Sequence, residues 1–433
     1  MSTHAPQPAE TQPAETQPAG SQPAETQPAG SQPAGSQPAG SQPAGSQPAR
    51  FRPAENQPAM PLLIPGDRVP HFKARTRSNP QFTFDSVGGR WIVLGFYGSL
   101  KPEGRAAAVH KMMAASDVFD DQHACLFMVS ADAEDEAQLH DAIPGRRIFW
   151  DFDLRVARLY GAAVSADGAQ TAYGAQWMLI DPCLTLRHMV PMTGDDQGVQ
   201  EVLDRLRAAP APETYLGFAV PPPVLILPDV FEASFCDHLI DIYHKKGAEP
   251  SGFMRDKDGQ TVGIMDASFK VRRDCMLDDP ELIRATQARV QRKVIPQIAR
   301  VHYFQCTRME RYMVGGYPAD EGGHFRPHRD NTTLGTAHRR FAVSINLNDD
   351  FEGGAVAFPE YSPHGIKAPR GAAVIFSCSL LHAVGKVTSG TRYAFLPFLY
   401  DDAAAKLREA NAAKVSGGTG YKADQTHVAP GQA

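Results

Sequence analysis

Two histidines and one aspartate have the residue types and the spacing of a metal site. His328 and Asp330 stand two residues apart in the segment HFRPHRD, and His382 follows later in LLHAVGKV. Residues two apart on a β-strand point to the same face of a sheet, so His328 and Asp330 are expected to bind one ion together. Two histidines and one carboxylate leave coordination positions open on a ferrous ion, whereas a structural zinc site is closed and usually richer in cysteine. The sequence therefore predicts a reactive non-haem iron site.

An arginine downstream of this triad has the chemistry to bind a carboxylate. Arg392, in GTRYAFLPF, has the same even-numbered parity as His382, so a strand–turn–strand unit can direct both side chains inward. A guanidinium presents a planar fork of donors that matches a carboxylate through two parallel hydrogen bonds. Ser344 and Asn346 lie on the face of their strand opposite its apolar residues, and they are expected to line the same pocket.

The C-terminal half of the chain contains an ordered set of short motifs around these residues. They are YMVGGY at 312–317, HRD at 328–330, NLN at 346–348, EGG at 352–354, PRGAAVIF at 369–376, His382 and Arg392. Together they resemble the prolyl 4-hydroxylase-like branch of the Fe(II)/2-oxoglutarate oxygenases. The resemblance implies a double-stranded β-helix, which is a cupin-like jelly roll, with Fe(II), 2-oxoglutarate and O2 as cofactors and ascorbate as an allowed addition. The chain departs from the family between Gly316 and His328, where the additional residues PADEGGHFRP are expected to shape the substrate entrance.

The same resemblance implies a role for each residue of the site. His328, Asp330 and His382 are expected to bind the metal and to form the catalytic centre, and Arg392 and Tyr312 are expected to bind 2-oxoglutarate. The implied reaction is hydroxylation, because Asp330 occupies a position that a halide would need in a halogenase. The expected substrate is a protein or peptide side chain, proline included, or a small amino-acid-like molecule.

Each of these roles has an alternative that the sequence leaves open. His328 and Asp330 could form a surface pair. His382 could be a core histidine, and Arg392 could be a structural ion-pair residue. Tyr312 could pack in the core instead of binding 2-oxoglutarate. His324 is a second candidate ligand, because on a helix it would pair with His328 four residues later, but strand geometry favours His328.

The N-terminal segment differs in composition from the rest of the chain. Residues 1–59 carry repeats of QPAET and QPAGS, with a proline at every fifth position and almost no large apolar side chain. Proline removes a backbone donor and fixes φ, and no apolar area is available to offset the ordering entropy. The segment is therefore predicted to be a disordered arm with polyproline II character. A tether is the simplest use of such an arm, and a second hypothesis makes its prolines a substrate of the chain's own oxygenase domain.

Residues 60–208 alternate apolar strands with helices. Near-continuous apolar strands separated by helical periodicity indicate an α/β sheet that is covered on both faces. Cys125 lies within one of these predicted buried strands, which argues against a reactive thiol there. Strands are expected at 91–98, 123–131, 176–182 and 184–190, and helices at 105–119, 153–161 and 199–208.

Three short motifs lie in the 60–208 region: GDRVPHF at 66–72, DFDLRVARLYG at 151–161 and LID at 179–181. They resemble the peroxiredoxin branch of the thioredoxin fold. That family needs a thiolate at a helix start, where the helix dipole lowers the thiol pKa. Arg105 stands where the cysteine is expected, and Ala175 stands where an arginine usually precedes the LID strand. We therefore expect a scaffold, docking or substrate-presenting domain.

The remaining boundaries follow from changes in composition. The proline-rich stretch 209–223 is predicted to be a linker. In 224–402, helices at 232–246 and 279–302 precede a run of short strands, which favours an α+β domain with an antiparallel barrel. Residues 403–433 are predicted to be a C-terminal tail.

Composition also limits the expected partners and location. A net charge of −5 gives no indication of binding to nucleic acid or to an anionic membrane. The N-terminus has no signal-peptide character, no apolar run is long enough for a transmembrane helix, and six cysteines are scattered without a CxxC pair. We expect a cytoplasmic protein. The alternatives are a redox-partner or binding protein with two degenerate domains, and a thiol peroxidase with an oxygenase appended, against which Arg105 argues.

Overall fold

Strand β3 (Trp91–Gly98) is the centre of the first sheet, and all of its residues are buried. The computed structural model describes residues 62–164, 171–193, 197–417 and 421–423, so the predicted repeat arm lies outside the described residues. β3 pairs in parallel with β4 and antiparallel with β8, in a sheet of order β5-β4-β3-β8-β9. The other strands are β4 (Ala124–Ser130), β5 (Arg146–Trp150), β8 (Gln176–Ile180) and β9 (Leu186–Pro191).

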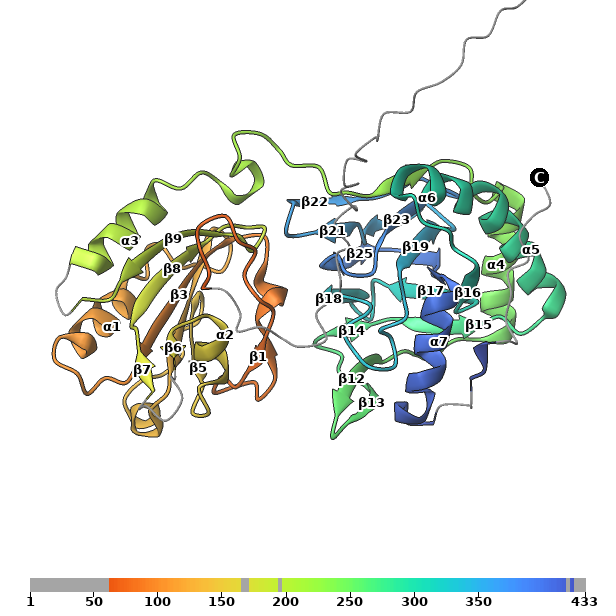
Figure 1. The fold of residues 1–433 in the computed structure, drawn as a ribbon. Helices are drawn as coiled ribbons and strands as arrows, with labels where there is room; N and C mark the ends of the chain where they lie inside the picture. The colour runs from red at the N-terminus through yellow and green to blue at the C-terminus, as the bar shows by residue number, and fades with distance from the viewer. Residues whose placement is uncertain (1–61, 165–170, 194–196, 418–420, 424–433) are drawn as a thin grey trace, which may run out of the picture. The chain divides into compact units, whose positions relative to one another are not determined.

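Helices and loops cover both faces of this sheet (Figure 1). On one face, α1 (Arg105–Ala114) and α3 (Gln197–Arg207) bury their apolar side chains in a cluster with Trp177. On the other face, α2 (Arg155–Leu159) and the segment that contains Phe84 form a second cluster. This two-sided burial explains why the strands are apolar at consecutive positions.

The sequence predicts most elements of this α/β domain, with shifts at their ends. The helix expected over 105–119 ends at Ala114. Strand β5 was not predicted, because Arg146 and Arg147 interrupt the apolar pattern before Ile148. Backbone pairing with β4 stabilises β5 as a strand, although the local sequence pattern does not indicate one.

Strand β19 (Phe341–Asn346) shows how the larger sheet of the C-terminal half is built. Phe341, Val343 and Ile345 join the cluster under the helices, while the alternate residues face the interior of the barrel. The sheet order is β10-β23-β19-β26-β17-β15-β11, with β27 pairing β16 and β19. The other strands are β10 (Leu225–Leu227), β11 (Glu249–Pro250), β15 (Arg273–Met276), β16 (Arg308–Glu310), β17 (Met313–Pro318), β23 (Ala373–Ser377), β26 (Thr391–Phe395) and β27 (Phe398–Tyr400).

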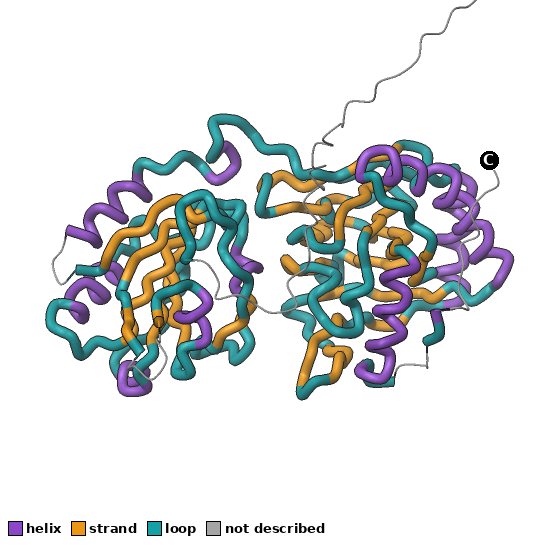
Figure 2. Tube along the Cα trace, viewed as in Figure 1, coloured by secondary structure: helices purple, strands orange, loops and turns teal. Residues whose placement is uncertain are grey.

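A smaller sheet of order β14-β18-β24-β21-β22 completes the barrel (Figure 2). The two sheets share an apolar core in which Phe358 of the smaller sheet contacts Phe376 of the larger one. Pairing in both sheets is antiparallel, which confirms the predicted jelly roll. The strands are β14 (Lys270–Val271), β18 (His324–His328), β21 (Val356–Phe358), β22 (Ser362–Ile366) and β24 (His382–Val384).

Helices α4 (Ala233–Lys246), α5 (Pro280–Lys293) and α6 (Ile295–His302) pack against the larger sheet. The single helix expected over 279–302 is divided between α5 and α6, because Pro296 has no backbone donor and restricts the residue before it. The predicted tail contains most of a further helix, α7 (Asp402–Asn411). None of the helices in the described ranges has the length and apolar character needed to cross a bilayer.

A buried carboxylate joins α7 to the barrel. Glu310 accepts a hydrogen bond from Nε of Arg339 at 2.7 Å, and its other oxygen lies 2.9 Å from Nη1 of Arg408 and 3.1 Å from Nε2 of His338. Burial by itself raises the pKa of Glu310, but the charges of Arg339 and Arg408, with the hydrogen bond to His338, hold it well below its usual range. A buried ion cluster of this kind is strongly destabilised when one member is removed.

We expect Glu310→Gln to lower the free energy of unfolding by about 3 kcal/mol, because Arg339 and Arg408 would lose their buried counter-charge. Since the folded-state pKa of Glu310 is depressed, its contribution is present at neutral pH and is lost as the pH falls below the unfolded-state value. Urea unfolding followed by far-ultraviolet circular dichroism measures the change. Glu232→Gln is the matched control, because Glu232 forms exposed ion pairs that are worth at most about 1 kcal/mol. An equal loss in both variants would contradict the prediction.

Candidate metal centre

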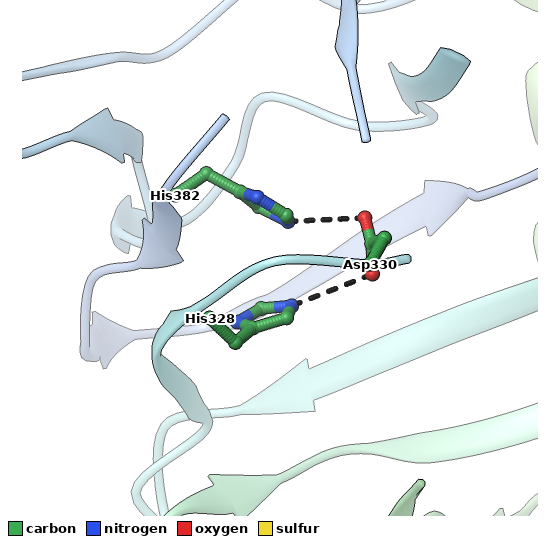
Figure 3. Close-up of side chains that lie close together, drawn as sticks. All are labelled: His328, Asp330 and His382. Atoms are coloured by element: carbon green, nitrogen blue, oxygen red, sulfur yellow. Dashed lines mark ion pairs between the residues drawn. The ribbon is translucent and has the colours of Figure 1, made fainter. Parts of the chain in front are cut away.

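The structure brings His328, Asp330 and His382 together (Figure 3). Nε2 of His328 lies 3.6 Å from one carboxylate oxygen of Asp330, and Nε2 of His382 lies 3.2 Å from the other. The ligand atoms of the three side chains lie within 4.8 Å of one another. This donor set can hold one metal ion on a single face and leave its remaining positions open.

The backbone that places these side chains differs in one detail from the prediction. Strand β18 ends at His328, and Asp330 lies in the following turn rather than on the strand. The amide of Asp330 donates to the carbonyl oxygen of Cys378 at 3.0 Å, which fixes the turn. In the pairing of β18 with β24, His328 stands directly opposite His382. The two histidines are therefore positioned by strand register, and Asp330 is positioned by the turn.

Hydrogen bonds orient each imidazole toward the centre. Nδ1 of His328 contacts the carbonyl oxygen of Arg326 at 2.7 Å, and Nδ1 of His382 contacts that of Leu380 at 3.0 Å, so Nε2 of each ring faces Asp330. Such outer contacts fix ring orientation in metal sites. Burial, with the neighbouring imidazole of His382, lowers the pKa of His328 to about 3. Burial opposes ionisation of Asp330, but the two histidines hold its pKa well below the usual range. Neutral His328 and ionised Asp330 are the forms that bind metal.

Arg392 lies inside the barrel and is 1% exposed. Its Nε donates to the side-chain oxygen of Asn346 at 3.0 Å, and its Nη2 donates to the hydroxyl of Ser344 at 2.7 Å. These are the two polar residues that the alternation of β19 predicts for the pocket. Nη1 of Arg392 is buried without a hydrogen-bond partner among the described residues. A buried charged donor in that state is costly, so the position fits an anionic ligand such as the distal carboxylate of 2-oxoglutarate.

The structure does not bring Tyr312 to this pocket. Its hydroxyl bonds to the side chain of Gln287 on α5 at 2.6 Å, and its ring packs against the core beneath the helices. Tyr317 occupies the pocket instead, with its ring 5.3 Å from the guanidinium carbon of Arg392. Positions 312 and 317 have opposite parity in and beside β17, so they face opposite sides of the sheet. Strand parity was the signal that could have distinguished the two tyrosines.

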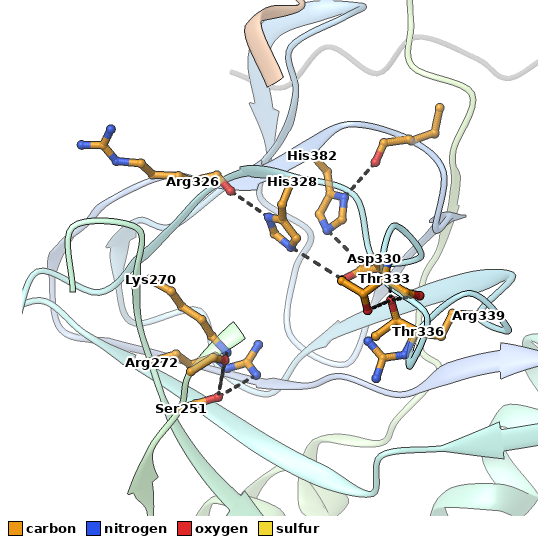
Figure 4. A network of polar contacts seen from close by, with 12 residues as sticks. Ser251, Lys270, Arg272, Arg326, His328, Asp330, Thr333, Thr336, Arg339 and His382 are labelled. Carbon is orange, nitrogen blue, oxygen red and sulfur yellow. Dashed lines mark hydrogen bonds and ion pairs between the residues drawn. The ribbon is translucent and has the colours of Figure 1, made fainter. Parts of the chain in front are cut away.

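A group of basic residues near the pocket was also missed by sequence reasoning (Figure 4). Arg272 makes two hydrogen bonds to Asp274, at 2.6 and 2.8 Å, and its third nitrogen lies 3.4 Å from the Tyr317 hydroxyl. Nζ of Lys270 donates to the hydroxyl of Ser251 at 2.7 Å. Burial, with the charge of Arg272, lowers the pKa of Lys270 to about 6. The available signal was the density of charge in KVRRD at 270–274, where four of the five residues are charged.

Comparison with known proteins identifies the domain around this site. Residues 307–400 match the 2OG-Fe(II) oxygenase superfamily. A PKHD-type hydroxylase of Prochlorococcus marinus is 28% identical over 139 residues, which is 31% of this chain and 62% of that protein. A PKHD-type hydroxylase of Hyphomonas neptunium is 31% identical over 123 residues, which is 26% of this chain and 50% of that protein. The chain thus spans between half and two thirds of these curated relatives.

Several solved structures resemble part of the chain at low sequence identity. A prolyl-4-hydroxylase of Pseudomonas putida is 14% identical and covers 41% of this chain and 92% of its own, with a TM-score of 0.34. A Trichoplax adhaerens prolyl hydroxylase is 16% identical and covers 49% of this chain and 96% of its own, with a TM-score of 0.36. A bacterioferritin comigratory protein of Xanthomonas campestris is 17% identical and covers 32% and 90%, with a TM-score of 0.28.

The C-terminal half therefore carries a 2OG-Fe(II) oxygenase domain. This assignment implies Fe(II), 2-oxoglutarate and O2 as the cofactors of the domain. The His–Asp–His cluster supplies metal donors of the required kind, and the unpaired nitrogen of Arg392 supplies a carboxylate donor. The residues present thus fit both groups.

Replacement of Asp330 should abolish Fe(II) binding, because two neutral imidazoles alone neither neutralise nor enclose the ion. Anaerobic titration of the full chain with Fe(II) by calorimetry measures this for Asp330→Ala. His324→Ala is the control, since His324 bonds instead to the carbonyl oxygen of Gly322 and is not part of the cluster. Loss of Fe(II) binding in the His324 variant, with binding retained in the Asp330 variant, would show that the ligand set is different.

Proposed function

We propose that the chain is an Fe(II)- and 2-oxoglutarate-dependent dioxygenase that hydroxylates a protein or peptide side chain, proline included, or an amino-acid-like molecule. The observation that carries the proposal is the pairing of two binding groups in one barrel. One is the His328, Asp330 and His382 cluster, and the other is the buried unpaired nitrogen of Arg392. A 2-oxo dicarboxylate has complementary groups at its two ends.

Different residues of the site would bind the metal and the 2-oxo acid. When bound, ferrous iron and 2-oxoglutarate supply the activation of O2 and the oxidation of a C–H bond. His328, Asp330 and His382 would hold the metal, and two of them, His328 and Asp330, line the cavity. Arg392, held by Ser344 and Asn346, would bind the distal carboxylate, and the apolar core between the sheets would exclude water.

The size of the cavity supports the proposed substrate class, and the relatives support the proposed reaction. A cavity of about 1000 Å3 borders His328 and Asp330, which is room for a side chain together with neighbouring backbone. The curated relatives are named PKHD-type hydroxylases. The cavity favours a peptide or amino-acid-like substrate, and the names of the relatives favour hydroxylation as the reaction. The proline-rich repeats of residues 1–59 add the hypothesis that these prolines are themselves a substrate.

We also propose that residues 60–208 form a thioredoxin-like domain that is not a peroxidase. The sheet order β5-β4-β3-β8-β9, with β3 and β4 parallel and β8 antiparallel to β3, supports the proposed fold. Arg105 begins α1 and donates to the carbonyl oxygen of Tyr97 at 3.0 Å, at the position where a peroxidase needs its thiolate. Burial raises the pKa of Cys125 to about 12, which disfavours its thiolate. The alternative of a redox-partner or binding protein remains for this half, while the intact metal cluster argues against it for the other half.

The activity is tested by incubating the full chain with Fe(II), 2-oxoglutarate, O2 and a panel of proline-containing peptides. We expect succinate release that rises with the right peptide, together with a mass gain of one oxygen atom on that peptide. A matching gain on residues 1–59 of the chain itself would identify the arm as a substrate. Metal binding without 2-oxoglutarate-dependent succinate release under any condition would favour the binding-protein alternative.

Arg392→Gln should raise the KM for 2-oxoglutarate by about 10-fold or more, because a charge-assisted hydrogen bond is worth about 1.5–3 kcal/mol. Binding of Fe(II) alone should stay unchanged. Tyr317→Phe should also raise this KM, whereas Tyr312→Phe should not, because the Tyr312 hydroxyl faces α5. Succinate release at varied 2-oxoglutarate concentration measures all three. A larger effect of Tyr312→Phe than of Tyr317→Phe would contradict the assignment.

A further inference from the structure

Arg329 stands between two of the metal ligands and bonds to the first domain. Its side chain is 5% exposed. Nε of Arg329 donates to a carboxylate oxygen of Asp85 at 2.8 Å, and Nη2 donates to Glu360 at 2.9 Å. Asp85 lies in the short helix Phe84–Val87 of the α/β domain, within the same compact unit as the barrel, 59–433. The residue that joins His328 to Asp330 is thus held from outside the barrel.

The same cluster reaches the segment of the third ligand. Nη1 of Arg329 donates to the carbonyl oxygen of Ser379. Glu360, which is fully buried, accepts from the amide of Leu381 at 3.4 Å, immediately before His382. Both chain segments that carry metal ligands therefore contact the guanidinium of Arg329 or its carboxylate partner.

Two glycines of the first domain allow this close approach. A Cβ atom on Gly88 would lie 2.7 Å from Cγ of Glu360, and one on Gly89 would lie 2.2 Å from the carbonyl oxygen of Pro359. Gly89 also has a φ of +92°, which side chains other than glycine disfavour. Arg68 of the first domain adds a second cation to Glu360. Close backbone packing against Pro359 and Glu360 therefore contributes to this contact, in addition to the ion pairs.

The first domain also borders the cavity in front of the metal ligands. Phe82, Thr83 and Ser86 line it from the first domain, and His328 and Asp330 line it from the barrel. Asp85 lies between these lining positions. The segment that holds Arg329 is therefore also a wall of the space that a substrate would enter.

We propose that the first domain completes the oxygenase site and that Asp85 is a positioning residue, which acts on the metal ligands through Arg329. The inference rests on the proposed function. Asp85 is ionised in this setting: burial raises its pKa, but hydrogen bonds from His71 and Arg329 outweigh burial and lower it to about 2. Without that carboxylate, Arg329 loses one of two buried counter-charges, and the turn between the ligands loses its outer support.

The test is the affinity for Fe(II) of the full chain, measured anaerobically with 2-oxoglutarate through the visible absorption of the complex. Asp85→Asn should weaken Fe(II) binding by about 10-fold, as loss of outer contacts does in other metal sites. Glu136→Gln is the matched control, because Glu136 pairs with Arg75 at the surface of the same domain. It should leave the affinity unchanged.

A double-mutant cycle separates positioning from general destabilisation. If Asp85 acts through Arg329, Asp85→Asn combined with Arg329→Gln should bind Fe(II) no more weakly than Arg329→Gln alone. Tryptophan fluorescence reports whether the first domain stays folded, because Trp91, Trp150 and Trp177 are all the tryptophans of the chain. Additive losses, or unchanged affinity in a folded Asp85→Asn variant, would overturn the inference. Absence of the absorption in the unmodified chain would instead overturn the proposed function.

Discussion

The cross-strand pairing of His328 with His382 is the contact on which the site depends. Register places the two imidazoles opposite each other, and the turn after β18 brings Asp330 within 3.6 Å of one and 3.2 Å of the other. All three groups are largely removed from water, so their polar atoms need a partner inside the protein. A divalent cation satisfies the carboxylate and both free ring nitrogens at once. A shift of either strand by one residue would direct a histidine to the opposite face.

Arg392 is a second binding group inside the barrel. Ser344 and Asn346 bind two of its nitrogens and leave the third without a partner among the described residues. The neighbouring cation Arg272 is already paired with Asp274, so of these two guanidiniums Arg392 is the one with unused capacity for an anion. A metal held by the His–Asp–His cluster would bind one end of a ligand, and the unpaired nitrogen of Arg392 would bind an anionic group at its other end. The α/β domain adds the outer support of the metal segments and a wall of the cavity.

Sequence reasoning predicted the metal cluster, Arg392 and the polar face of β19, because residue type and strand parity indicate which side chains lie on one face. It predicted the apolar strands of the first domain for the same reason. It placed Tyr312 in the pocket, but the five-residue offset to Tyr317 reverses the face of the strand, and Tyr312 packs under α5. Nothing local could reveal that Arg329 bonds to Asp85, since that contact depends on how distant segments fold together.

Anomalous diffraction from crystals grown without O2, in Mn(II) and 2-oxoglutarate, tests the central claim most directly. One strong peak is expected, bonded to Nε2 of His328, Nε2 of His382 and a carboxylate oxygen of Asp330. The distal carboxylate of 2-oxoglutarate should contact Nη1 of Arg392. A metal peak away from these three side chains, or a 2-oxoglutarate carboxylate that does not contact Arg392, would contradict the account.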